Sequence, residues 1–477
     1  MKKFVIVGAG TAGLLASLYV KNRFPSFEVT VVRSEEIGII GVGEGTTPHF
    51  MKTLSQLELD AIKIMKGSRG TFKNSIKFTN WSGDNSSYFH LFSLNSIEEF
   101  TLAKLIHDKI DLNKNVFEGN QSDDGIINLK STMAMHFDSS KMAHILEKIA
   151  IDRGIEFINA EAEDFNTDDR GFITQIVLSD GRKVDSDFVF DCTGFHRKII
   201  GKFYNQKWVS FSDFLPAKKA LAFWLEKENI LKPYTESIAL NSGWSWKIPT
   251  QDRIGSGYVF DSNYLSDEEA IREVSDFYGV DVEVRKSIPF DPGTHDKLWV
   301  KNCVALGLAG SFLEPLEATS LWHTQTQIEI LFEDVGIFSN LFVDESKKRD
   351  DYNFRIFDMI KSSAEFIYLH YYSVREDTPF WKEFKKVNPI PERIKDIISG
   401  IESGNFYHMN FSYGPNEHSH FSGVGKFSPG SVTVVSKGNG ILKKINFPDY
   451  VKEVKNSSRV PEPEFVNHEE FLNSIRL

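Results

Sequence analysis

Cysteine is scarce in this chain, with only Cys192 and Cys303 among 477 residues. Two thiols cannot form a disulfide framework, and neither belongs to a C-x-x-C pair, so a disulfide-rich secreted protein is excluded and a cytoplasmic location is expected. Positive charge is also in short supply, because 55 Lys and Arg face 66 Asp and Glu and give a formal net charge of −11. This balance argues against general binding to nucleic acid or to an anionic membrane.

A recognisable metal-binding spacing is missing as well. His418-Ser419-His420 is the one suggestive pair of histidines, and it lacks a further ligand at a supporting distance along the chain, so we expect no metal. With 41% hydrophobic residues, the chain can form one large composite domain or two to three smaller ones. The 40 Phe, 14 Tyr and 8 Trp are too many for one pocket, so most are expected in the core and the others around a flat aromatic substrate.

The N-terminus carries a glycine pattern typical of dinucleotide binding. A short apolar strand at residues 4–7 precedes Gly8, Gly10 and Gly13, at G-x-G-x-x-G spacing, and a helical run at 14–20 follows. The first glycine permits a tight turn, the second lets the backbone approach a pyrophosphate, and the third lets helix and strand pack closely. A charged start before an apolar run also fits a signal peptide, but no small-residue cleavage site follows, so we favour the dinucleotide interpretation.

The second strand should end in an acidic residue that binds the adenosine ribose. In this chain the strand at residues 29–32 is followed by Arg33. Ser34, Glu35 or Glu36 could replace the missing acid, or Arg33 could stack on the adenine. The prediction of a phosphate site holds in each case.

An aromatic run in the middle of the chain gives the glycine motif a more specific meaning. Residues 244–249 read W-x-W-x-I-P, which is a strand with two aromatics on one face and a proline at its end. Together with G-x-G-x-x-G, it resembles the signature pair of the flavin-dependent halogenases, the tryptophan-halogenase family. The resemblance implies that the first motif binds FAD and that the second lies in the substrate half and discourages monooxygenation. The residues of this second motif are Trp244, Trp246, Ile248 and Pro249.

Three further segments resemble the same family and occur in the same order. Residues 41–48 are similar to a G-V-G-E-A-T-x-P strap that contacts the flavin, 190–194 to a strand ending in D-C-S-G, and 311–320 to F-L-E-P-L-E-S-T-G. The resemblance extends over about residues 1–385. It assigns the flavin contacts to Gly8, Gly10, Thr11, Ala12, Gly13, Arg33, Gly43, Glu44, Gly194 and Gly307.

These segments predict an α/β (α+β) fold in which a Rossmann-like FAD-binding module with the GxGxxG motif is discontinuous. We expect FAD-binding segments with a lysine-bearing insert in residues 1–200 and a substrate-side β-sheet in 201–295. A return to the FAD and halide is expected in 296–330, and a mainly helical, divergent part in 331–477.

Local patterns predict a helix and a hairpin between the flavin segments. Residues 142–149 repeat at helical spacing, and Gly154 ends the helix. Strands at 172–178 and 184–190 flank Asp180-Gly181, which is a strong turn signal.

The resemblance points to Lys73, within T-F-K-N at 71–74, as the active-site lysine. It implies that reduced FAD and O₂ convert a halide ion into hypohalous acid. Lys73 then hydrogen-bonds this acid or becomes a haloamine, and an electron-rich ring attacks the halogen. Such a lysine needs a partly desolvated site, and Lys77 is its competitor. Glu317 is expected to polarise the halogenating species and act as the general base; an ion pair or a helix cap is the alternative role.

Two more pairs of residues complete the expected site. The family holds halide on the backbone amides of a Thr-Gly pair, which is Thr319-Ser320 here. Because serine does not adopt positive φ freely, either the anion nest is reshaped or the hydroxyl adds a donor. We therefore hypothesise that bromide or iodide, which are easier to dehydrate and oxidise, is preferred over chloride. His90 and Phe92 match an H-L-F segment that contacts the substrate, although a core role for His90 remains open.

The C-terminal part departs from the family. Tryptophan halogenases carry an N-Y-Y-C-I-like run that grips the amino acid, whereas residues 404–408 here read G-N-F-Y-H. We therefore expect another small aromatic substrate, such as a phenol, an indole or an N-heterocycle, in place of free tryptophan.

No second G-x-G-x-x-G opens a strand-helix unit, so the chain has no evident nicotinamide site. Reduced flavin is then expected from a separate NAD(P)H-dependent flavin reductase, while formation of a homo-oligomer stays open. The alternatives to a halogenase are a flavin-dependent monooxygenase and an inactive flavin-binding protein. W-x-W-x-I-P together with Lys73 favours the halogenase.

Overall fold

A computed structural model of the chain describes residues 2–34, 44–92, 115–117, 120–121, 127–128, 133–334, 346–402, 424–427, 429–442 and 465–474. The chain forms two compact units, each assembled from three separate segments. Unit 1 comprises Met1–Gly70, Phe137–Ser210 and Pro292–Ile360. Unit 2 comprises Thr71–His136, Phe211–Asp291 and Lys361–Leu477. The predicted mixed α/β fold with a discontinuous N-terminal module is confirmed.

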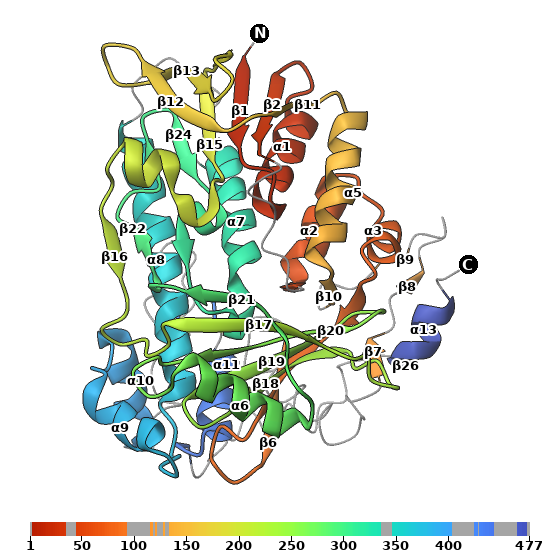
Figure 1. The fold of residues 1–477 in the computed structure, drawn as a ribbon, viewed down its shortest axis with the longest axis vertical. Coiled ribbons are helices and arrows are strands. Elements are labelled where there is room, and N and C mark those ends of the chain that lie inside the picture. Colours follow the sequence, from red (N-terminus) through yellow and green to blue (C-terminus); the bar gives the residue numbers. More distant parts are fainter. Residues whose placement is uncertain are drawn as a thin grey trace, which may run out of the picture. The chain divides into compact units, whose positions relative to one another are not determined.

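Unit 1 is organised around a six-stranded sheet in the order β11-β2-β1-β15-β24-β23 (Figure 1). The first five strands are parallel, and β23 returns antiparallel to β24. The strands are β1 (Lys3–Val7), β2 (Glu28–Arg33), β11 (Glu156–Asn159), β15 (Phe188–Asp191), β23 (Trp299–Val300) and β24 (Cys303–Ala305). The helices of this unit are α1 (Thr11–Arg23), α2 (Pro48–Gln56), α3 (Ala61–Gly67), α5 (Ser139–Asp152) and α7 (Thr319–Glu329).

Strand β1 is buried on both faces, as the central strand of a parallel sheet must be. Val5 and Val7 belong to one core, which also contains residues of two smaller strands, β12 (Ala162–Thr167) and β13 (Ile173–Leu178). Phe4 points to the other face, where its ring lies 5.5 Å from that of Phe27. This double burial explains why residues 4–7 are an uninterrupted apolar run and why they precede the glycine turn at a fixed position.

One sequence prediction in this unit was wrong. The run at 184–190 is not a single strand, because β14 (Lys183–Asp185) ends before β15 begins. The hairpin across Gly181, which has φ +83°, joins β13 to β14, whereas β15 pairs in parallel with β1. Ser186 and Asp187 separate the strands, and the Asp187 carboxylate accepts a hydrogen bond from the Lys3 backbone N–H (2.8 Å). The β-propensity of the run was correct, but a break between two sheets leaves no signal in residue type.

Unit 2 is organised around a seven-stranded sheet in the order β21-β17-β20-β19-β18-β5-β6. Its pairings are antiparallel except that β18 and β5 run in parallel. The strands are β5 (Ser75–Thr79), β6 (Ser87–Leu91), β17 (Lys219–Leu225), β18 (Tyr234–Ala239), β19 (Gly243–Pro249), β20 (Ile254–Phe260) and β21 (Val284–Pro289). A separate pair joins β4 (Thr71–Lys73) to β10 (Ala134–Phe137), with Lys73 opposite Ala134.

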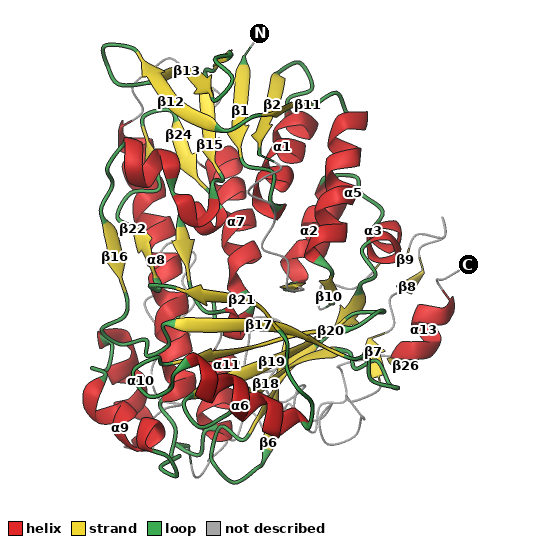
Figure 2. Ribbon diagram, viewed as in Figure 1, coloured by secondary structure: helices red, strands yellow, loops and turns green. Residues whose placement is uncertain are grey.

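Helices make up most of the described C-terminal part, as predicted (Figure 2). The long helix α8 (Ser346–Tyr371) links the last segment of unit 1 to the last segment of unit 2. It is followed by α9 (Pro379–Val387), α10 (Glu392–Glu402), α11 (Pro429–Gly438) and α13 (His468–Ser474). Unit 2 also contains α6 (Asp267–Tyr278), whose Ala270 and Val274 pack in one cluster with residues of β17, β18 and β20.

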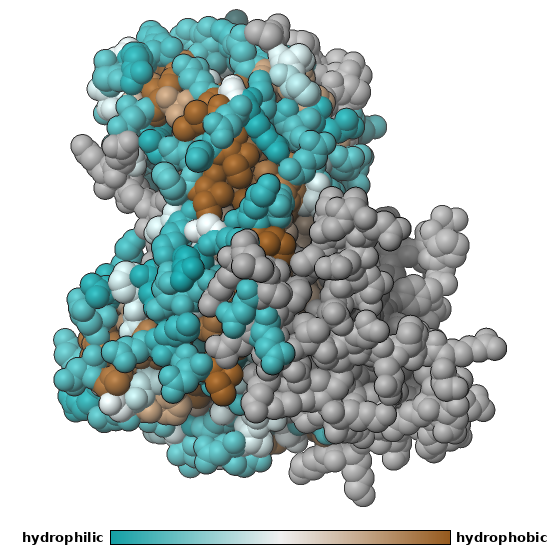
Figure 3. Space-filling model, turned by 90° about the vertical axis from the view of Figure 1, so that its right-hand side faces the viewer, coloured by the Kyte–Doolittle hydropathy of each residue, from teal (hydrophilic) through white to brown (hydrophobic). Residues whose placement is uncertain are grey.

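The remaining short strands complete the described elements. They are β3 (Glu44–Gly45), β7 (Asn115–Phe117), β8 (Asn120–Gln121), β9 (Ile127–Asn128), β16 (Trp208–Ser210), β22 (Gly293–His295), β25 (Ser311–Phe312) and β26 (Phe465–Asn467). None of the helices in the described part of the chain is long and apolar enough to cross a membrane. The face drawn in Figure 3 is mainly hydrophilic where residues are described, with hydrophobic side chains gathered in smaller patches.

The W-x-W-x-I-P motif forms β19, between β18 and β20 at the centre of the unit 2 sheet. Trp244 and Trp246 are only 1% and 5% exposed, and their ring centroids lie 6.0 Å apart. Opposite Trp246 is Gly257, where an added Cβ would lie 2.0 Å from the Trp246 Cη2 atom and 2.5 Å from the Leu221 carbonyl oxygen. The tryptophan ring therefore occupies space that only a glycine leaves open.

We expect Gly257→Ala to destabilise the protein by about 1–3 kcal/mol, because overpacking forces the indole or the neighbouring strand to move. Urea unfolding of the wild type and the variant measures this change. Trp246→Phe serves as the matched partner, since the smaller ring vacates part of the space. The double variant should lose less than the sum of the two single losses. A Gly257→Ala protein as stable as the wild type would contradict this packing.

Candidate active-site residues in the two units

The glycine turn of unit 1 has the geometry that a dinucleotide phosphate requires. Gly8 has φ +116°, and a Cβ there would lie 2.2 Å from the Cys192 carbonyl oxygen. A Cβ at Gly13 would lie 2.0 Å from the Gly8 carbonyl oxygen, so helix α1 and the turn are in close contact. At Gly10, by contrast, an added Cβ meets no atom within 4 Å. This open cradle precedes the N-terminus of α1, where backbone N–H groups favour an anion, so the site fits the pyrophosphate of FAD.

The later flavin segments return to this turn. Gly307 has φ +61°, and a Cβ there would lie 2.9 Å from the Ala12 Cβ in the first turn of α1. Gly194, with φ +61°, lies three residues after the end of β15, and Cys192 between them donates its backbone N–H to the Val7 carbonyl (2.9 Å). Three segments far apart in the sequence therefore converge around the end of β1. The predicted positions Gly8, Gly194 and Gly307 lie in this one region of unit 1.

Sequence reasoning missed Asp191, the residue that orders the loop after β15. Asp191, fully buried at the end of β15, accepts hydrogen bonds at Oδ1 from the Thr193 backbone N–H (3.1 Å) and hydroxyl (2.6 Å). Its Oδ2 accepts from the backbone N–H groups of Ile199 and Ile200, both at 2.9 Å. A carboxylate with four donors fixes the loop that carries Gly194. The sequence did contain a signal, because Asp191 is an acidic residue that begins the D-C-T-G run at the end of an apolar strand.

Glu44 of the strap lies beside the first residues of two helices in unit 1. Burial raises the pKa of its carboxyl group to about 7, while the hydroxyls of Ser139 and Thr11 act in the opposite direction. Thr11 opens α1 and Ser139 opens α5. Glu44 is thus next to the N-terminus of α1, where the glycine motif predicts the phosphate site. Gly43, the other strap residue assigned to the flavin, lies outside the described residues.

Arg33 ends β2, where the acidic ribose ligand was expected. Its Nη1 atom lies 2.6 Å from Oε2 of Glu147 on α5, and its guanidinium carbon lies 5.8 Å from the centroid of the Phe157 ring. Glu35 and Glu36, two of the candidates for replacing the acid, lie outside the described residues. Arg33 is therefore held by protein groups on two neighbouring elements.

The predicted halide loop forms a helix start in unit 1. Glu317 ends a single 3₁₀ turn at Pro315–Glu317 and is 3% exposed. Ala318 then takes the left-handed conformation (φ +53°, ψ +39°), and Thr319 and Ser320 are the first residues of α7. The positive φ of this loop therefore lies at Ala318, two residues before Ser320, which stands where the resemblance places the family's glycine. The N-cap residue of α7 is Ala318, which makes no side-chain cap hydrogen bond, and a helix N-terminus of this kind suits an anion.

Lys73 lies at the end of β4 in unit 2 and is fully buried. Its Nζ atom lies 4.8 Å from the centroid of the Phe92 ring, so the structure brings together two of the predicted residues. The strand is tied to the W-x-W-x-I-P motif, because the Thr71 hydroxyl donates to the Pro249 carbonyl oxygen (2.7 Å). The motif and the lysine are thereby parts of one hydrogen-bonded arrangement.

This hydrogen bond determines the state of His136. A carbonyl only accepts, so the single proton of the Thr71 hydroxyl is committed to Pro249, and its oxygen must accept from His136 Nδ1 (3.0 Å). The other ring nitrogen, Nε2, lies 3.0 Å from the Thr235 hydroxyl. Burial, followed by the charge of Lys73, lowers the pKa of His136 well below its usual value. His136 is therefore neutral, with its proton on Nδ1, and Nε2 accepts from Thr235.

A second neutral histidine reaches β4 from the C-terminal helix. His468 Nδ1 donates to the Leu231 carbonyl (3.0 Å), which leaves Nε2 to accept the backbone N–H of Phe72 (3.1 Å). Burial lowers the pKa of His468 to about 4, against the effect of the Leu231 carbonyl. No sequence signal marked His136 or His468, because neither has a motif and both come from segments distant from Lys73.

The competing lysine, Lys77, has a structural environment. Its Nζ lies 3.5 Å from Oε1 of Glu236 on the neighbouring strand β18, which is paired with β5 at this position. The same nitrogen lies 5.7 Å from the centroid of the Tyr234 ring. The pairing with a carboxylate makes Lys77 a poor halogen carrier and a useful control.

His90 is largely packed into the protein. It is 8% exposed, and its Nε2 lies 2.8 Å from the Ser431 hydroxyl. Its ring centroid lies 5.8 Å from that of Phe366 and 6.5 Å from that of Phe427, and these two phenyl rings stack at 3.8 Å. A core role and a wall of the substrate site are both compatible with these contacts.

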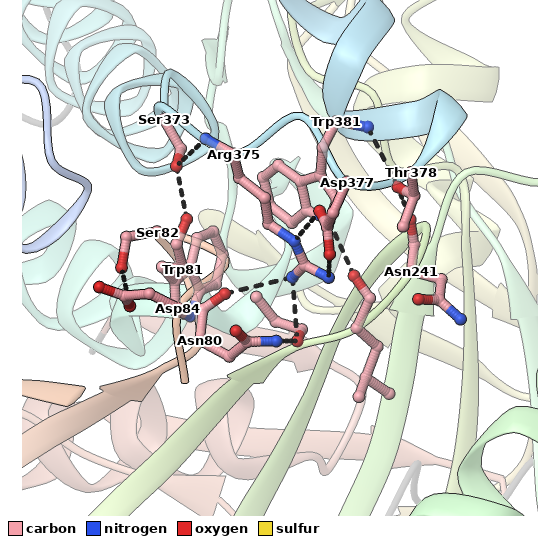
Figure 4. Close-up of polar contacts among 12 residues, drawn as sticks. Asn80, Trp81, Ser82, Asp84, Asn241, Ser373, Arg375, Asp377, Thr378 and Trp381 are labelled. Carbon is pink, nitrogen blue, oxygen red and sulfur yellow. Dashed lines mark hydrogen bonds and ion pairs between the residues drawn. The ribbon is translucent and has the colours of Figure 1, made fainter. Parts of the chain in front are cut away.

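The connection between α8 and α9 is locked to the unit 2 sheet by Arg375 (Figure 4). Its guanidinium binds Asp377 at two points, Nε to Oδ1 at 2.6 Å and Nη2 to Oδ2 at 3.0 Å. Nη1 donates to the carbonyls of Asn80 and Ala239, each at 3.2 Å, and the carbon of the group lies 4.9 Å from the Trp381 ring. Four of the five N–H groups of this buried cation thus have acceptors, so it stabilises the frame of the unit.

Two further predictions, the divergent run in place of the amino-acid-binding segment and the pair of histidines, cannot be placed in the structure. Residues 404–408 and His418-Ser419-His420 lie outside the described residues. Within the described ranges, no group of three or more His, Cys, Asp or Glu is arranged to hold a metal ion.

Comparisons with known proteins agree with the geometry. A sequence model of the family described as Tryptophan halogenase matches residues 3–442. Tryptophan 6-halogenase ThaL of Streptomyces albogriseolus is 30% identical over 85% of this chain and 82% of its own length. The crystal structure of the tryptophan 6-halogenase SttH from Streptomyces toxytricini has a TM-score of 0.83, with 26% identity, and covers 99% of this chain and 100% of that chain. BrvH, a flavin-dependent halogenase from Brevundimonas sp. BAL3, has a TM-score of 0.79, with 27% identity, and covers 100% and 99% of the two chains.

The environment of Glu44 makes stability depend on pH. Its pKa in the folded state, about 7, exceeds the ordinary 4.5. The folded protein therefore holds this proton more tightly, and stability should fall as the pH rises from about 4.5 to about 7 and then level off. Glu44→Gln should remove about 1–3 kcal/mol of that decline. Urea unfolding without FAD at pH 5 and pH 8 measures it, with exposed Glu163→Gln as control. Identical pH dependence in wild type and Glu44→Gln would refute this assignment.

Proposed function

Since this chain belongs to the tryptophan halogenase family, we propose that it uses reduced FAD, O₂ and a halide ion to halogenate an electron-rich aromatic ring through Lys73. The observation that carries this proposal is the burial of Lys73 on a strand that Thr71 ties to Pro249 of W-x-W-x-I-P. Halogenation is common to the flavin-dependent members of the family, whereas the substrate and the halide are the specific part of the proposal.

Unit 1 supplies the residues that would hold the cofactor. Gly8, Gly10 and Gly13 would bind the pyrophosphate at the start of α1, and Gly194 and Gly307 would border the same region. Bound FAD in its reduced form supplies two electrons, which, with two from the halide, reduce O₂ and give hypohalous acid and water. The role of this unit is to orient the cofactor and exclude bulk water. A separate NAD(P)H-dependent flavin reductase in the cytoplasm would provide the reduced flavin.

Lys73 would receive the oxidised halogen. The Lys73 side chain is fully buried, with its Nζ atom beside the Phe92 ring, so it has little water to solvate it. A directed N–H donor in a medium of low polarity binds hypohalous oxygen more strongly than it does in water. An unprotonated amine at this position can instead take the halogen as a haloamine. Glu317 would accept the proton that the ring loses when it is halogenated.

The start of α7 would hold the halide. Because α7 begins directly after the left-handed residue Ala318, the N–H groups of Thr319 and Ser320 belong to a helix end. Such an end favours any anion through its partial positive charge and gives little discrimination by size. The easier dehydration and oxidation of bromide and iodide then decide the preference.

The substrate class follows from the departure at the C-terminus. The relatives ThaL and SttH are named for halogenating tryptophan, but the sequence at 404–408 lacks the run associated with amino-acid binding. We propose phenols, indoles or N-heterocycles without an amino-acid group as substrates.

Lys73→Met should abolish halogenation, with a loss of at least about 100-fold in turnover, while FAD binding remains. Lys77→Met should stay within a few-fold of the wild type, because Lys77 is paired with Glu236 on the sheet. Mass spectrometry of products from a panel of phenols, indoles and tryptophan, with FAD, NADH, a flavin reductase and bromide, measures both. Halogenation that survives in Lys73→Met would overturn the role of Lys73, and hydroxylated products from the wild type would indicate a monooxygenase.

The halide preference is tested by turnover with chloride, bromide and iodide side by side. We expect bromide or iodide to exceed chloride by about tenfold, which corresponds to 1.4 kcal/mol in the barrier. Ser320→Gly, which restores the glycine of the family's Thr-Gly pair and permits a positive φ there, should raise chloride turnover relative to bromide. Chloride turnover equal to or above that with bromide in the wild type would contradict the proposed halide preference.

A further inference from the structure

The end of β2 presents an unusual pair in place of the expected acid. Arg33 is the last residue of β2, and Nη1 of its guanidinium lies 2.6 Å from Oε2 of Glu147. The side chains of Arg33 and Glu147 are 28% and 20% exposed, so both are partly screened from solvent but reachable. Phe157 of the adjacent strand β11 lies beneath the guanidinium at 5.8 Å.

These contacts fix the arginine and bring in a carboxylate. A charge-assisted hydrogen bond at this distance is among the strong ones, and a ring beside the guanidinium restricts it further. Arg33 is thus turned toward α5 and away from the role of a free group that could stack on an adenine. Glu147 is in turn held beside the last residue of β2, which is where dinucleotide-binding folds present an acid to the ribose.

The chemistry of the ribose selects among the described residues Arg33, Ser34 and Glu147. Ribose hydroxyls are donors that a carboxylate accepts best, and an arginine has only donors to offer. A carboxylate has about four lone-pair positions, so Glu147 can keep its bond to Arg33 and still accept from a hydroxyl. Ser34 offers a neutral hydroxyl, which gives a weaker hydrogen bond than a charged acceptor.

We propose that Glu147 of α5, positioned by Arg33, is the carboxylate that binds the ribose of the adenosine half of FAD. The acidic group has moved from the end of β2 to the neighbouring helix, and Arg33 serves as its anchor. This inference rests on the proposed function, because it requires that unit 1 binds FAD. It adds a residue that discriminates FAD from FMN, since FMN lacks the adenosine.

The test measures ligand binding to the apoprotein by flavin fluorescence and by competition. Glu147→Gln keeps the size of the side chain and removes its charge, and it should weaken FAD binding about tenfold while leaving FMN affinity unchanged. ADP should displace FAD from the wild type better than 2′-deoxy-ADP does, and Glu147→Gln should lose that difference. The double variant Arg33→Glu/Glu147→Arg returns an acid to β2 and should restore the discrimination.

Asp185→Asn is the matched control, because Asp185 forms an ion pair with Lys3 at the other end of the parallel sheet. It should bind all four ligands as the wild type does. Equal loss of FAD and FMN in Glu147→Gln, or retained preference for ADP over 2′-deoxy-ADP, would overturn the role of Glu147. A wild type that binds FMN and FAD with equal affinity would overturn it too. A wild type that binds no flavin would overturn the proposed function itself.

Discussion

The hydrogen bond from the Thr71 hydroxyl to the Pro249 carbonyl is the constraint on which the lysine site depends. A proline has no N–H, but its carbonyl remains an acceptor, and the position at the end of β19 leaves that carbonyl available outside the ladder. The bond commits the only proton of Thr71, and this fixes the tautomer of His136. One residue of W-x-W-x-I-P thereby reaches the strand that carries Lys73. The two tryptophans act differently, because they are packed in the sheet that holds Pro249 in place.

A comparable constraint operates in unit 1, where the end of β1 is surrounded by backbone in close contact. Gly8 and Gly13 exclude any side chain, while the space at Gly10 stays open. The buried side chain of Asp191 holds the loop after β15 through the hydrogen bonds that it accepts. The polar groups that would face a cofactor are therefore fixed by contacts that do not involve the cofactor. Such preorganisation lowers the entropy that binding must overcome.

Much of this arrangement could be predicted from the sequence, and the reasons are physical. The glycines with obligatory conformations and the W-x-W-x-I-P run are local patterns from which the discontinuous module could be predicted, whereas Lys73 was predicted from the resemblance of T-F-K-N to the family's segment. The residues around Lys73 could not, because Thr71, His136 and His468 meet only through long-range pairing. Arg33 showed that the usual acidic residue is missing at the end of β2. It did not indicate Glu147 as the replacement, because Glu147 lies 114 residues away. The break between β14 and β15 could not be predicted either, because the residues on both sides of it favour strands.

The account's central claim is that W-x-W-x-I-P acts on the lysine site through Pro249, Thr71 and a neutral His136. The most direct measurement is the ¹⁵N NMR spectrum of histidine-labelled protein across pH 5.5 to 8, with His136→Gln to identify the signals. The account predicts a neutral ring with its proton on Nδ1 throughout, because burial and Lys73 lower the pKa of His136 well below its usual value. A ring protonated on Nε2, or one that titrates near pH 6.5, would contradict the claim.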